Sequence, residues 1–147
     1  MYTVIGRFAP QAFAIMRIVI GVLWALHGVQ ILFGVPPMKG MSGPLPPIVL
    51  AAGVIELVGG LLVAIGLATG ITAFIASGTM AVAYFAGHLG PAMSKGTPFG
   101  WHPITNQGEL AIVYCFIFLF IAAHGAGVWS IDALIRGRRA VTAPMTS

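Results

Sequence analysis

Residues 48–67 read IVLAAGVIELVGGLLVAIGL, and Glu56 is the single ionisable residue in this run. An α-helix of this length measures about 30 Å, which matches the hydrocarbon thickness of a bilayer. Apolar residues occur on every side of such a helix, without the period-two alternation of a strand in a membrane barrel. The run therefore predicts a helix that spans a membrane.

Three further apolar runs of similar length lie at residues 13–33, 71–87 and 109–126. The first run is longer than the apolar core of a signal peptide, which has about 7–15 residues, so we expect it to remain as a helix. Together with residues 48–67, these runs predict an all-α chain that crosses the membrane four times.

The segments between the runs predict how the helices connect. Residues 67–70 form a short turn, so the second and third helices should form an antiparallel hairpin. Residues 34–47 and 88–108 are rich in proline and glycine, which favours loops. We therefore expect a single domain over residues 1–147, an antiparallel four-helix membrane bundle with a short amphipathic C-terminal segment.

The composition excludes most soluble classes of protein. Hydrophobic residues make up 59% of the 147 residues and charged residues 7%, whereas soluble domains have about 45–50% and about 25%. So few charges cannot cover the surface of a soluble domain. The net charge of +4 comes from residues at the flanks of the apolar runs, so we expect a lipid bilayer and no nucleic acid as partner. The single cysteine, Cys115, excludes an internal disulfide, and its apolar neighbours predict a buried, unreactive thiol.

Basic residues predict the orientation of the chain in the membrane. Five arginines lie in the two terminal segments, two lysines lie in the two long loops, and the short turn has no basic residue. Lysine and arginine are enriched on the cytoplasmic side, and four crossings place both termini on the same side. We therefore expect both termini to be cytoplasmic. The arginines are Arg7, Arg17, Arg136, Arg138 and Arg139, and the lysines are Lys39 and Lys95.

Glu56 is the costliest residue of these runs, because a charged side chain at mid-membrane costs about 2.5–3.5 kcal/mol on insertion scales. The residues that share its helix face at four-residue spacing are small, namely Ala52, Gly60 and Ala64. A neighbouring helix can therefore approach closely and bury the carboxyl group. Two roles are consistent with this position: a structural hydrogen bond between helices, or a carboxyl group that faces a ligand or a proton path.

Polar residues from all four predicted helices should meet in the half of the bundle that lies away from the cytoplasm. They form a candidate cofactor-binding pocket: His27, Gln30, Glu56, Tyr84, His88 and Glu109. Two of them have simpler interpretations, because Glu109 suits a helix N-terminus and His88 suits the membrane interface. The sequence predicts no metal site.

We expect Glu56 to be protonated or hydrogen-bonded inside this pocket, because burial disfavours a carboxylate, with His27, Gln30 or Tyr84 within reach as partners. A partner left without its bond costs about 1–3 kcal/mol. The sequence therefore predicts that Glu56→Gln is tolerated and that Glu56→Leu is not.

Arg17 and Asp132 are predicted to lie at the cytoplasmic boundary, one near the start of the first helix and one after the fourth. Their opposite charges favour a structural ion pair. The alternative is that the Arg17 side chain extends along its helix until the guanidinium reaches the lipid headgroups.

Four stretches carry a resemblance to a known family. They read HGVQILFG at 27–34, GVIELVGGLLVAIGLAT at 53–69, GELA at 108–111 and GVWSIDAL at 127–134. With Arg17, these motifs make the chain similar to DoxX-type proteins over residues 13–135. The resemblance implies a multi-pass four-helix bundle of the bacterial inner membrane, in which Glu56 and Glu109 are the glutamates of the second and fourth helices.

The resemblance also has implications for function. Members of the family resemble the small membrane subunit of thiosulfate:quinone oxidoreductase, and others are linked to membrane oxidoreductase complexes that answer oxidative and thiol stress. Arg17 and Asp132 correspond to the family's pair of polar positions on the cytoplasmic side. The chain departs from the family pattern at Ile31, where lysine is common, and at Gly70, where arginine is common. The first departure removes an obvious cationic partner for Glu56.

Four functions are consistent with the sequence. The first is an accessory membrane subunit of a respiratory or redox complex that contacts quinone through His27, Gln30 and Glu56, without catalysis by this chain alone. No nucleotide loop, flavin fingerprint or iron–sulfur cysteine set is present, so electrons would come from a protein partner. The second is a purely structural or assembly subunit of a membrane complex or homo-oligomer. The third is a small transporter, and the fourth is a haem protein with His27 and His88 as ligands.

Overall fold

The computed structural model describes residues 5–37 and 43–142, with side chains described as far as residue 137. The elements, in chain order, are η1 (Gly6–Phe8), α1 (Ala9–Phe33), α2 (Pro47–Ile65), α3 (Thr69–Val82), η2 (Ala83–Leu89), α4 (Gly90–Ser94), α5 (Glu109–His124) and α6 (Ile131–Thr142). These residues form helices, turns and loops without any strand, which confirms the predicted all-α class. Lys39 and the side chains of Arg138 and Arg139 lie outside the described part.

Three helical segments are long and apolar enough to cross a membrane: Gly6–Phe33, Pro47–Ile65 and Thr69–Ser94. The fourth apolar helix, α5, has 16 residues and is shorter than the run predicted for it. Gly125 and Gly127 have φ angles of 84° and 66°, and glycine is the residue that adopts such angles without strain. These two glycines end α5 at His124.

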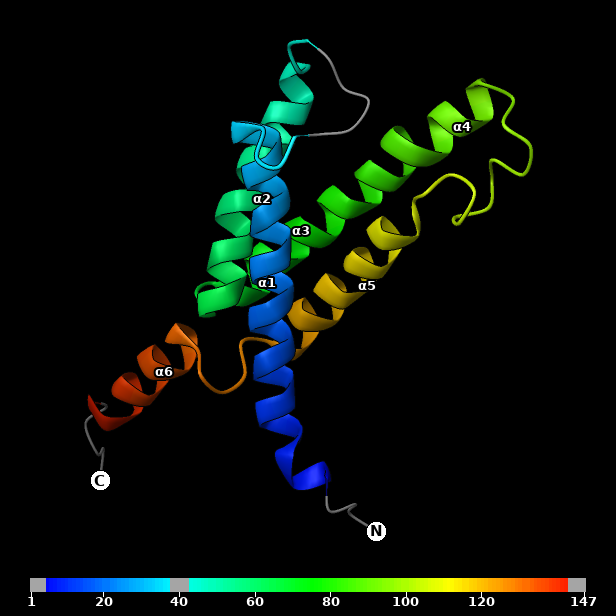
Figure 1. Ribbon diagram of the computed structural model, residues 1–147. Coiled ribbons are helices and arrows are strands. Elements are labelled where there is room, and N and C mark those ends of the chain that lie inside the picture. The colour runs from blue at the N-terminus through cyan, green and yellow to red at the C-terminus, as the bar shows by residue number, and fades with distance from the viewer. Residues whose placement is uncertain (1–4, 38–42, 143–147) are drawn as a thin grey trace.

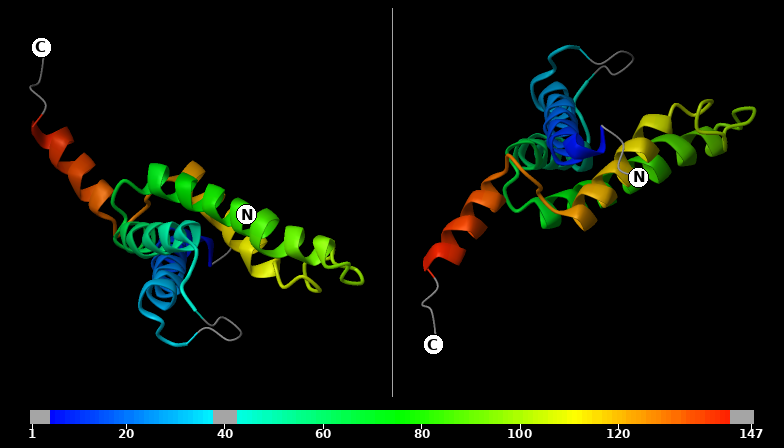
Figure 2. Two further views of the ribbon diagram at one scale, coloured as in Figure 1. Left: turned by 90° about the horizontal axis from the view of Figure 1, so that it is seen from above. Right: turned by 90° about the horizontal axis from the view of Figure 1, so that it is seen from below.

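The helices associate in two pairs (Figure 1, Figure 2). α1 lies along α2, and α3 lies along α5. Contacts between α2 and α3 join the pairs, which diverge toward the end at which α4 lies (Figure 1). α6 leaves the opposite end at an angle to the other helices. Packing is thus more extensive within each pair than between the pairs.

Small residues allow α1 and α2 to touch backbone to backbone. A Cβ atom on Gly60 would lie 2.5 Å from the backbone nitrogen of Ala25, and one on Gly21 would lie 2.6 Å from that of Ala64. This spacing leaves no room for a larger side chain. The predicted stripe of small residues through Gly60 and Ala64 is therefore the face of α2 that packs on α1.

Aromatic side chains connect the two helix pairs. The ring of Trp24 on α1 lies 4.7 Å from that of Phe118 on α5, and Tyr114 stacks on Phe118 with 5.8 Å between ring centroids. Ala73 and Ala76 of α3 are fully buried behind this layer. Their small size lets α5 approach α3 closely, so that the large rings project toward α1.

The third membrane helix is longer than its apolar run. The sequence predicts an end at residue 87 and a loop from residue 88, whereas the helix continues through η2 and α4 to Ser94. η2 is a π-helix, and the N–H group of Gly90 donates to the carbonyl oxygen of Phe85, five residues earlier. This wider turn accommodates Pro91, which lacks an N–H group and would clash with an ordinary α-helical turn. His88, which the sequence places where the third helix ends, therefore lies within the helix.

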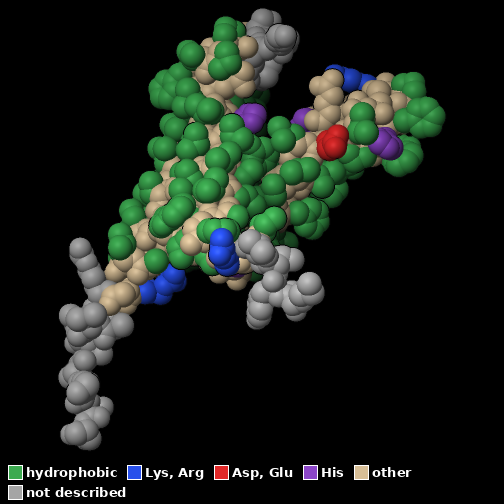
Figure 3. All heavy atoms as spheres, turned by 60° about the horizontal axis from the view of Figure 1, so that its bottom comes forward, with side chains coloured by type: hydrophobic (Ala, Val, Ile, Leu, Met, Phe, Trp, Pro, Cys, Tyr) green, Lys and Arg blue, Asp and Glu red, His purple; other side chains and the backbone are tan. Residues whose placement is uncertain are grey.

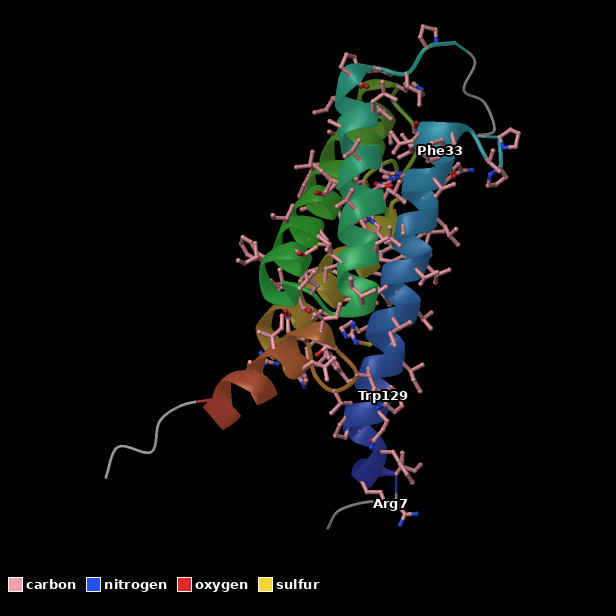
Figure 4. The ribbon with its side chains drawn as sticks, turned by 90° about the vertical axis from the view of Figure 1, so that its left-hand side faces the viewer. Arg7, Phe33 and Trp129 are labelled. Carbon is pink, nitrogen blue, oxygen red and sulfur yellow. The ribbon has the colours of Figure 1, made fainter. Side chains whose placement is uncertain are left out.

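The outer surface of the helices is apolar, as a bilayer requires. Large hydrophobic side chains cover most of the face seen in Figure 3, and Leu61, Phe74 and Phe116 are each more than half exposed. Lys and Arg side chains lie toward the ends of the molecule in the same view. Figure 4 shows α1 extending from the Arg7 end of the molecule to Phe33, with Trp129 beside its first half.

Candidate functional site

A cavity of about 250 Å³ lies between the two helix pairs. Its wall is built from α1, α2, α5, the continuous α3–η2 helix and the loop before α5. The polar and aromatic residues of the wall are Trp24, His27, Glu56, His88, Gln107 and Tyr114, and the others are apolar residues of α3, η2 and α5. A concave site with few polar groups in an apolar wall is typical of small-molecule binding.

Glu56 lies in the wall of this cavity. Its side chain is 7% exposed, because the small residues near it bring α1 against the same face of α2. The Oε2 atom is buried and has no hydrogen-bond partner among the described residues. None of the three expected partners, His27, Gln30 and Tyr84, forms a hydrogen bond to Glu56 in this part of the chain. The small residues on this face of α2 correctly predict that the Glu56 carboxyl group is buried. The hydrogen bond predicted for this carboxyl group is absent from the described residues.

Trp24 is the second residue of the wall with an unpartnered polar atom. Its side chain is 1% exposed, and Nε1 has no hydrogen-bond partner within the described residues. An indole N–H group can donate only, whereas a carboxyl oxygen such as Glu56 Oε2 can accept. A buried polar group without a partner costs about 1–3 kcal/mol. An occupant with one acceptor and one donor would relieve both costs.

Two histidines line the same cavity. The His27 ring lies edge-on to that of Tyr114, with 6.2 Å between centroids. His88 Nδ1 lies 3.1 Å from the carbonyl oxygen of Asn106, and it must be the donor because a carbonyl oxygen only accepts. In the neutral ring, this tautomer leaves Nε2 of His88 as an acceptor.

Asn106 holds the loop that positions His88 and the start of α5. Its buried side chain donates from Nδ2 to the carbonyl oxygen of Gly100 at 2.9 Å and accepts at Oδ1 from the N–H group of Gly108 at 2.8 Å. Its own carbonyl oxygen accepts from His88. Asn106 is not among the residues predicted from the sequence, because nothing in the pattern of a Pro- and Gly-rich loop distinguishes it.

Comparison with known proteins identifies the family. The sequence model of the DoxX family matches residues 12–89. An uncharacterized protein of Haemophilus influenzae is 41% identical over 128 residues, which cover 86% of this chain and 92% of that protein. The chain belongs to the DoxX family. No solved structure matches it. The resemblance carried by residues 27–34 and 53–69 is thereby confirmed, and with its apolar helices the chain is a DoxX-family membrane protein.

The cavity of this DoxX-family chain brings together three of the six predicted pocket residues, namely His27, Glu56 and His88. Gln30 does not line the cavity. Its Nε2 atom donates to the carbonyl oxygen of Pro36 at 3.1 Å, which holds the chain just after α1.

Tyr84 and Glu109 lie outside the lining as well. The Tyr84 ring fills the space beside Gly108, where a Cβ atom would lie 2.6 Å from it, and meets Phe85 edge-on at 5.2 Å. Glu109 is exposed in the first turn of α5, where the helix dipole favours an anion. This position agrees with the simpler of the two interpretations of Glu109.

Trp24, Gln107 and Tyr114 line the cavity but are absent from the predicted set. Both aromatic residues look like ordinary members of an apolar run, and Gln107 falls in a predicted loop. One signal was available, because Trp24 precedes His27 by three residues and therefore shares its helix face.

Arg17 is buried and does not extend to the headgroups. Its side chain is 0% exposed. The guanidinium donates to the carbonyl oxygens of Val63 at 2.6 Å, Ala64 at 2.7 Å and Trp129 at 2.7 Å. Val63 and Ala64 belong to the last turn of α2, at the negative end of the helix dipole, and the Val63 carbonyl oxygen also accepts from the N–H group of Gly66 at 3.1 Å. Arg17 thus ties α1 to the end of α2 and to the segment before α6.

Asp132 bonds to the start of α3 and not to Arg17. Its carboxylate accepts from the N–H groups of Ala68 and Thr69 and from the Thr69 hydroxyl, each at 2.9 Å, and its own N–H group donates to Gly66 O at 2.9 Å. No ion pair or hydrogen bond joins Asp132 to Arg17 in the described part of the chain. Each charge instead binds backbone groups at a helix end. We call this cluster, with Arg17 and Trp129, the terminal corner.

The pKa of the Asp132 carboxyl lies below its ordinary value. Burial acts to raise this pKa, but the hydrogen bonds from Thr69 and Ala68 and the nearby charge of Arg136 lower it by more. The carboxylate is therefore the form that holds the terminal corner together.

No three His, Cys, Asp or Glu side chains lie close enough to hold a metal ion within the residues that the structure describes. Cys115 is half-buried between α5 and α3, where its Sγ atom lies 3.5 Å from the Ser77 hydroxyl. The same hydroxyl donates to the Cys115 carbonyl oxygen at 2.9 Å. The thiol therefore belongs to the packing of α3 on α5.

Proposed function

We propose that this DoxX-family chain is a small integral membrane subunit of a bacterial respiratory or redox complex, and that its cavity receives the head group of a quinone. The observation that carries the proposal is the pair of unpartnered buried atoms, Trp24 Nε1 and Glu56 Oε2, in the wall of one cavity. The carbonyl oxygens of a quinone accept a hydrogen bond, and the hydroxyl groups of its reduced form donate one. Such a head group offers a partner to each of the two atoms.

The size of the cavity suits a ring and not a whole lipid-soluble quinone. Its volume of about 250 Å³ is below the roughly 300–1,000 Å³ of sites for drug-sized ligands. Trp24 and Tyr114 provide aromatic surface against which a ring can pack. The head group would fill the cavity, and its apolar tail would extend between the helices into lipid.

The residues of the cavity would orient the head group and exchange protons with it. A bound quinone would supply two-electron redox chemistry. Glu56 can accept a proton from a ligand hydroxyl, and the Nε2 atom of a neutral His88 ring can accept a hydrogen bond from one. The sequence contains no nucleotide-binding, flavin or iron–sulfur motif, so electrons would pass to or from a protein partner.

We also propose that α1, α2, the α3–α4 helix and α5 cross the bacterial inner membrane as an antiparallel four-helix bundle with cytoplasmic termini. The apolar lengths of the first three support this, as does the excess of arginine in the terminal segments. α5 is shorter, and local thinning of the bilayer accommodates a short apolar helix at modest cost. In this orientation the cavity lies in the half of the membrane away from the cytoplasm.

A purely structural or assembly subunit is the second candidate. The backbone contacts of α1 with α2 at Gly21 and Gly60 favour it, because they make a rigid helix pair whatever the cavity holds. The two candidates differ in one respect. Only the first requires that quinone copurifies with the chain and that Glu56 retains it.

Gentle purification from native membranes tests both candidates. Partner proteins are identified by mass spectrometry and quinone is measured in the lipid extract, for the wild type, Glu56→Leu and the lipid-facing control Val54→Leu. We expect the same redox partners for all three, and about tenfold less quinone for Glu56→Leu alone, since one buried hydrogen bond is lost. Partners without quinone in the wild type would support the structural candidate, and a chain without partners or quinone would contradict both.

A further inference from the structure

α6 has two chemically different faces. The helical period places Ile131, Leu134 and Ile135 on one side and Asp132 and Arg136 on the other. Leu134 is 68% exposed and Ile135 is 40% exposed, and Arg136 is exposed as well. The described protein therefore leaves the apolar face of α6 uncovered.

The terminal corner fixes the position, measured along the axis of α1, at which α6 begins. Asp132 bonds to the first turn of α3, and Arg17 holds the carbonyl oxygen of Trp129 just before α6. Gly127 packs on the ring of Phe13, because a Cβ atom at this glycine would lie 2.8 Å from that ring. The segment that enters α6 is thus level with Phe13 on α1.

That level coincides with an edge of the hydrocarbon layer. The part of α1 from Phe13 to Phe33 is about 30 Å long at 1.5 Å per residue, which is one hydrocarbon thickness. η1 and the exposed Arg7 lie beyond this edge. α6 therefore begins where hydrocarbon meets headgroups, and it departs at an angle to α1 (Figure 1).

We propose that α6 lies in this interface and binds the anionic surface of the bilayer, with Leu134 and Ile135 among the acyl chains and Arg136 at the headgroups. By the helical period, Arg139 follows Arg136 on the charged side of α6, whereas Arg138 follows Leu134, one turn further on. Amphipathic helices with a basic face bind anionic membranes in this way, through buried apolar area and electrostatic attraction together. Figure 3, with the lower end turned forward, shows basic side chains at this end of the molecule.

The depth of individual α6 positions tests the proposal. In a Cys115→Ser background, which removes the single native thiol, Leu134→Cys and Arg136→Cys are each labelled with an environment-sensitive fluorophore. The protein is reconstituted into vesicles of phosphatidylcholine with phosphatidylglycerol. We expect blue-shifted emission and quenching by spin-labelled lipids at position 134, and water-like emission at position 136. Water-like emission at both positions, or equal quenching at both, would overturn the proposal.

The lipid dependence of the same signal tests the anionic partner. Arg136→Gln, with the label at position 134, should lower the ratio of inserted to released α6 about fivefold in phosphatidylglycerol vesicles, since one basic residue contributes about 1 kcal/mol. The substitution should change nothing in vesicles of phosphatidylcholine alone. If α6 inserts equally in both kinds of vesicle, or if Arg136→Gln does not change its insertion, the proposal that α6 binds anionic lipid is overturned.

Discussion

Trp24 Nε1 and Glu56 Oε2 are both buried without a hydrogen-bond partner in the described chain, and both residues line the same cavity. Trp24 comes from α1 and Glu56 from α2, two helices that glycines hold in backbone contact. One atom donates and the other accepts. Folded proteins leave few buried polar groups unpaired, and the proposed ligand site rests on this pair in the wall of one cavity.

Glu56→Leu should leave the isolated protein as stable as the wild type or more stable. The substitution breaks no hydrogen bond of the described residues and removes a buried acceptor whose cost is about 1–3 kcal/mol. Thermal unfolding in detergent measures the effect, with Glu56→Gln as the variant that keeps a polar group. This expectation is the reverse of the one from sequence. A melting temperature several degrees lower for Glu56→Leu alone would show that the carboxyl group has a structural bond.

Gly60→Ala should separate α1 from α2. The new Cβ atom would lie 2.5 Å from the backbone nitrogen of Ala25, so the helices must move apart at a cost of about 1–3 kcal/mol. Gly78→Ala is the matched control, because no atom lies within 4 Å of a Cβ on Gly78 in α3. Alanine is the better helix former by about 0.5–1 kcal/mol, so the control should be neutral or stabilising. An equal decrease in the free energy of unfolding for the two variants, measured by denaturant titration, would contradict the backbone contact between α1 and α2.

Arg17→Lys should destabilise the protein although it keeps the charge. A single ammonium group cannot reproduce the planar geometry with which Arg17 reaches three carbonyl oxygens. Each lost charged hydrogen bond costs about 1.5–3 kcal/mol. The free energy of unfolding in detergent measures the effect, and the exposed Arg7→Lys provides the control. Equal stability of the two variants would contradict the three hydrogen bonds from Arg17 to backbone carbonyl oxygens.

Asp132 should make stability depend on pH. Its pKa is lower in the folded than in the unfolded chain, so its contribution is fully present above the ordinary pKa of aspartate and is lost as pH falls through the lowered value. Asp132→Asn cannot titrate. We expect the melting temperature of the wild type to exceed that of Asp132→Asn at neutral pH and to approach it in acid. A difference that stays constant over the whole range would contradict the carboxylate bonds to Ala68 and Thr69.

The class of fold and the burial of Glu56 could be predicted from local sequence. The length and polarity of the runs predict apolar helices, of which three segments are long enough to cross a membrane, and the small residues Gly60 and Ala64 mark the face of α2 that meets α1. The end of the third helix could not be predicted in the same way. Pro91 and Gly90 look like a loop, and the π-helix that accommodates them depends on hydrogen bonds five residues apart.

The bonds of the polar residues were less predictable than their approximate position. Arg17 and Asp132 do meet at one end of the molecule, but each binds backbone groups of a helix end, whose location depends on where α2 stops and α3 starts. The cavity likewise depends on how the helix pairs diverge. That geometry places Trp24 and Glu56 in one wall and leaves Gln30 outside, although Trp24 and Gln30 each lie three residues from His27 on the same helix face.

The indole N–H signal of Trp24 tests most directly whether the cavity binds a quinone head group. The chain has three tryptophans, so a ¹H–¹⁵N spectrum resolves the indoles of Trp24, Trp101 and Trp129 once each is assigned by a Trp→Phe variant. A short-chain quinone should shift the Trp24 signal in a saturable manner and leave the other two unchanged, and Glu56→Leu should weaken the binding of the reduced form about tenfold, as expected for one lost buried hydrogen bond. A Trp24 signal that does not respond, or that shifts equally with the other two as the quinone partitions into the detergent, would contradict the account.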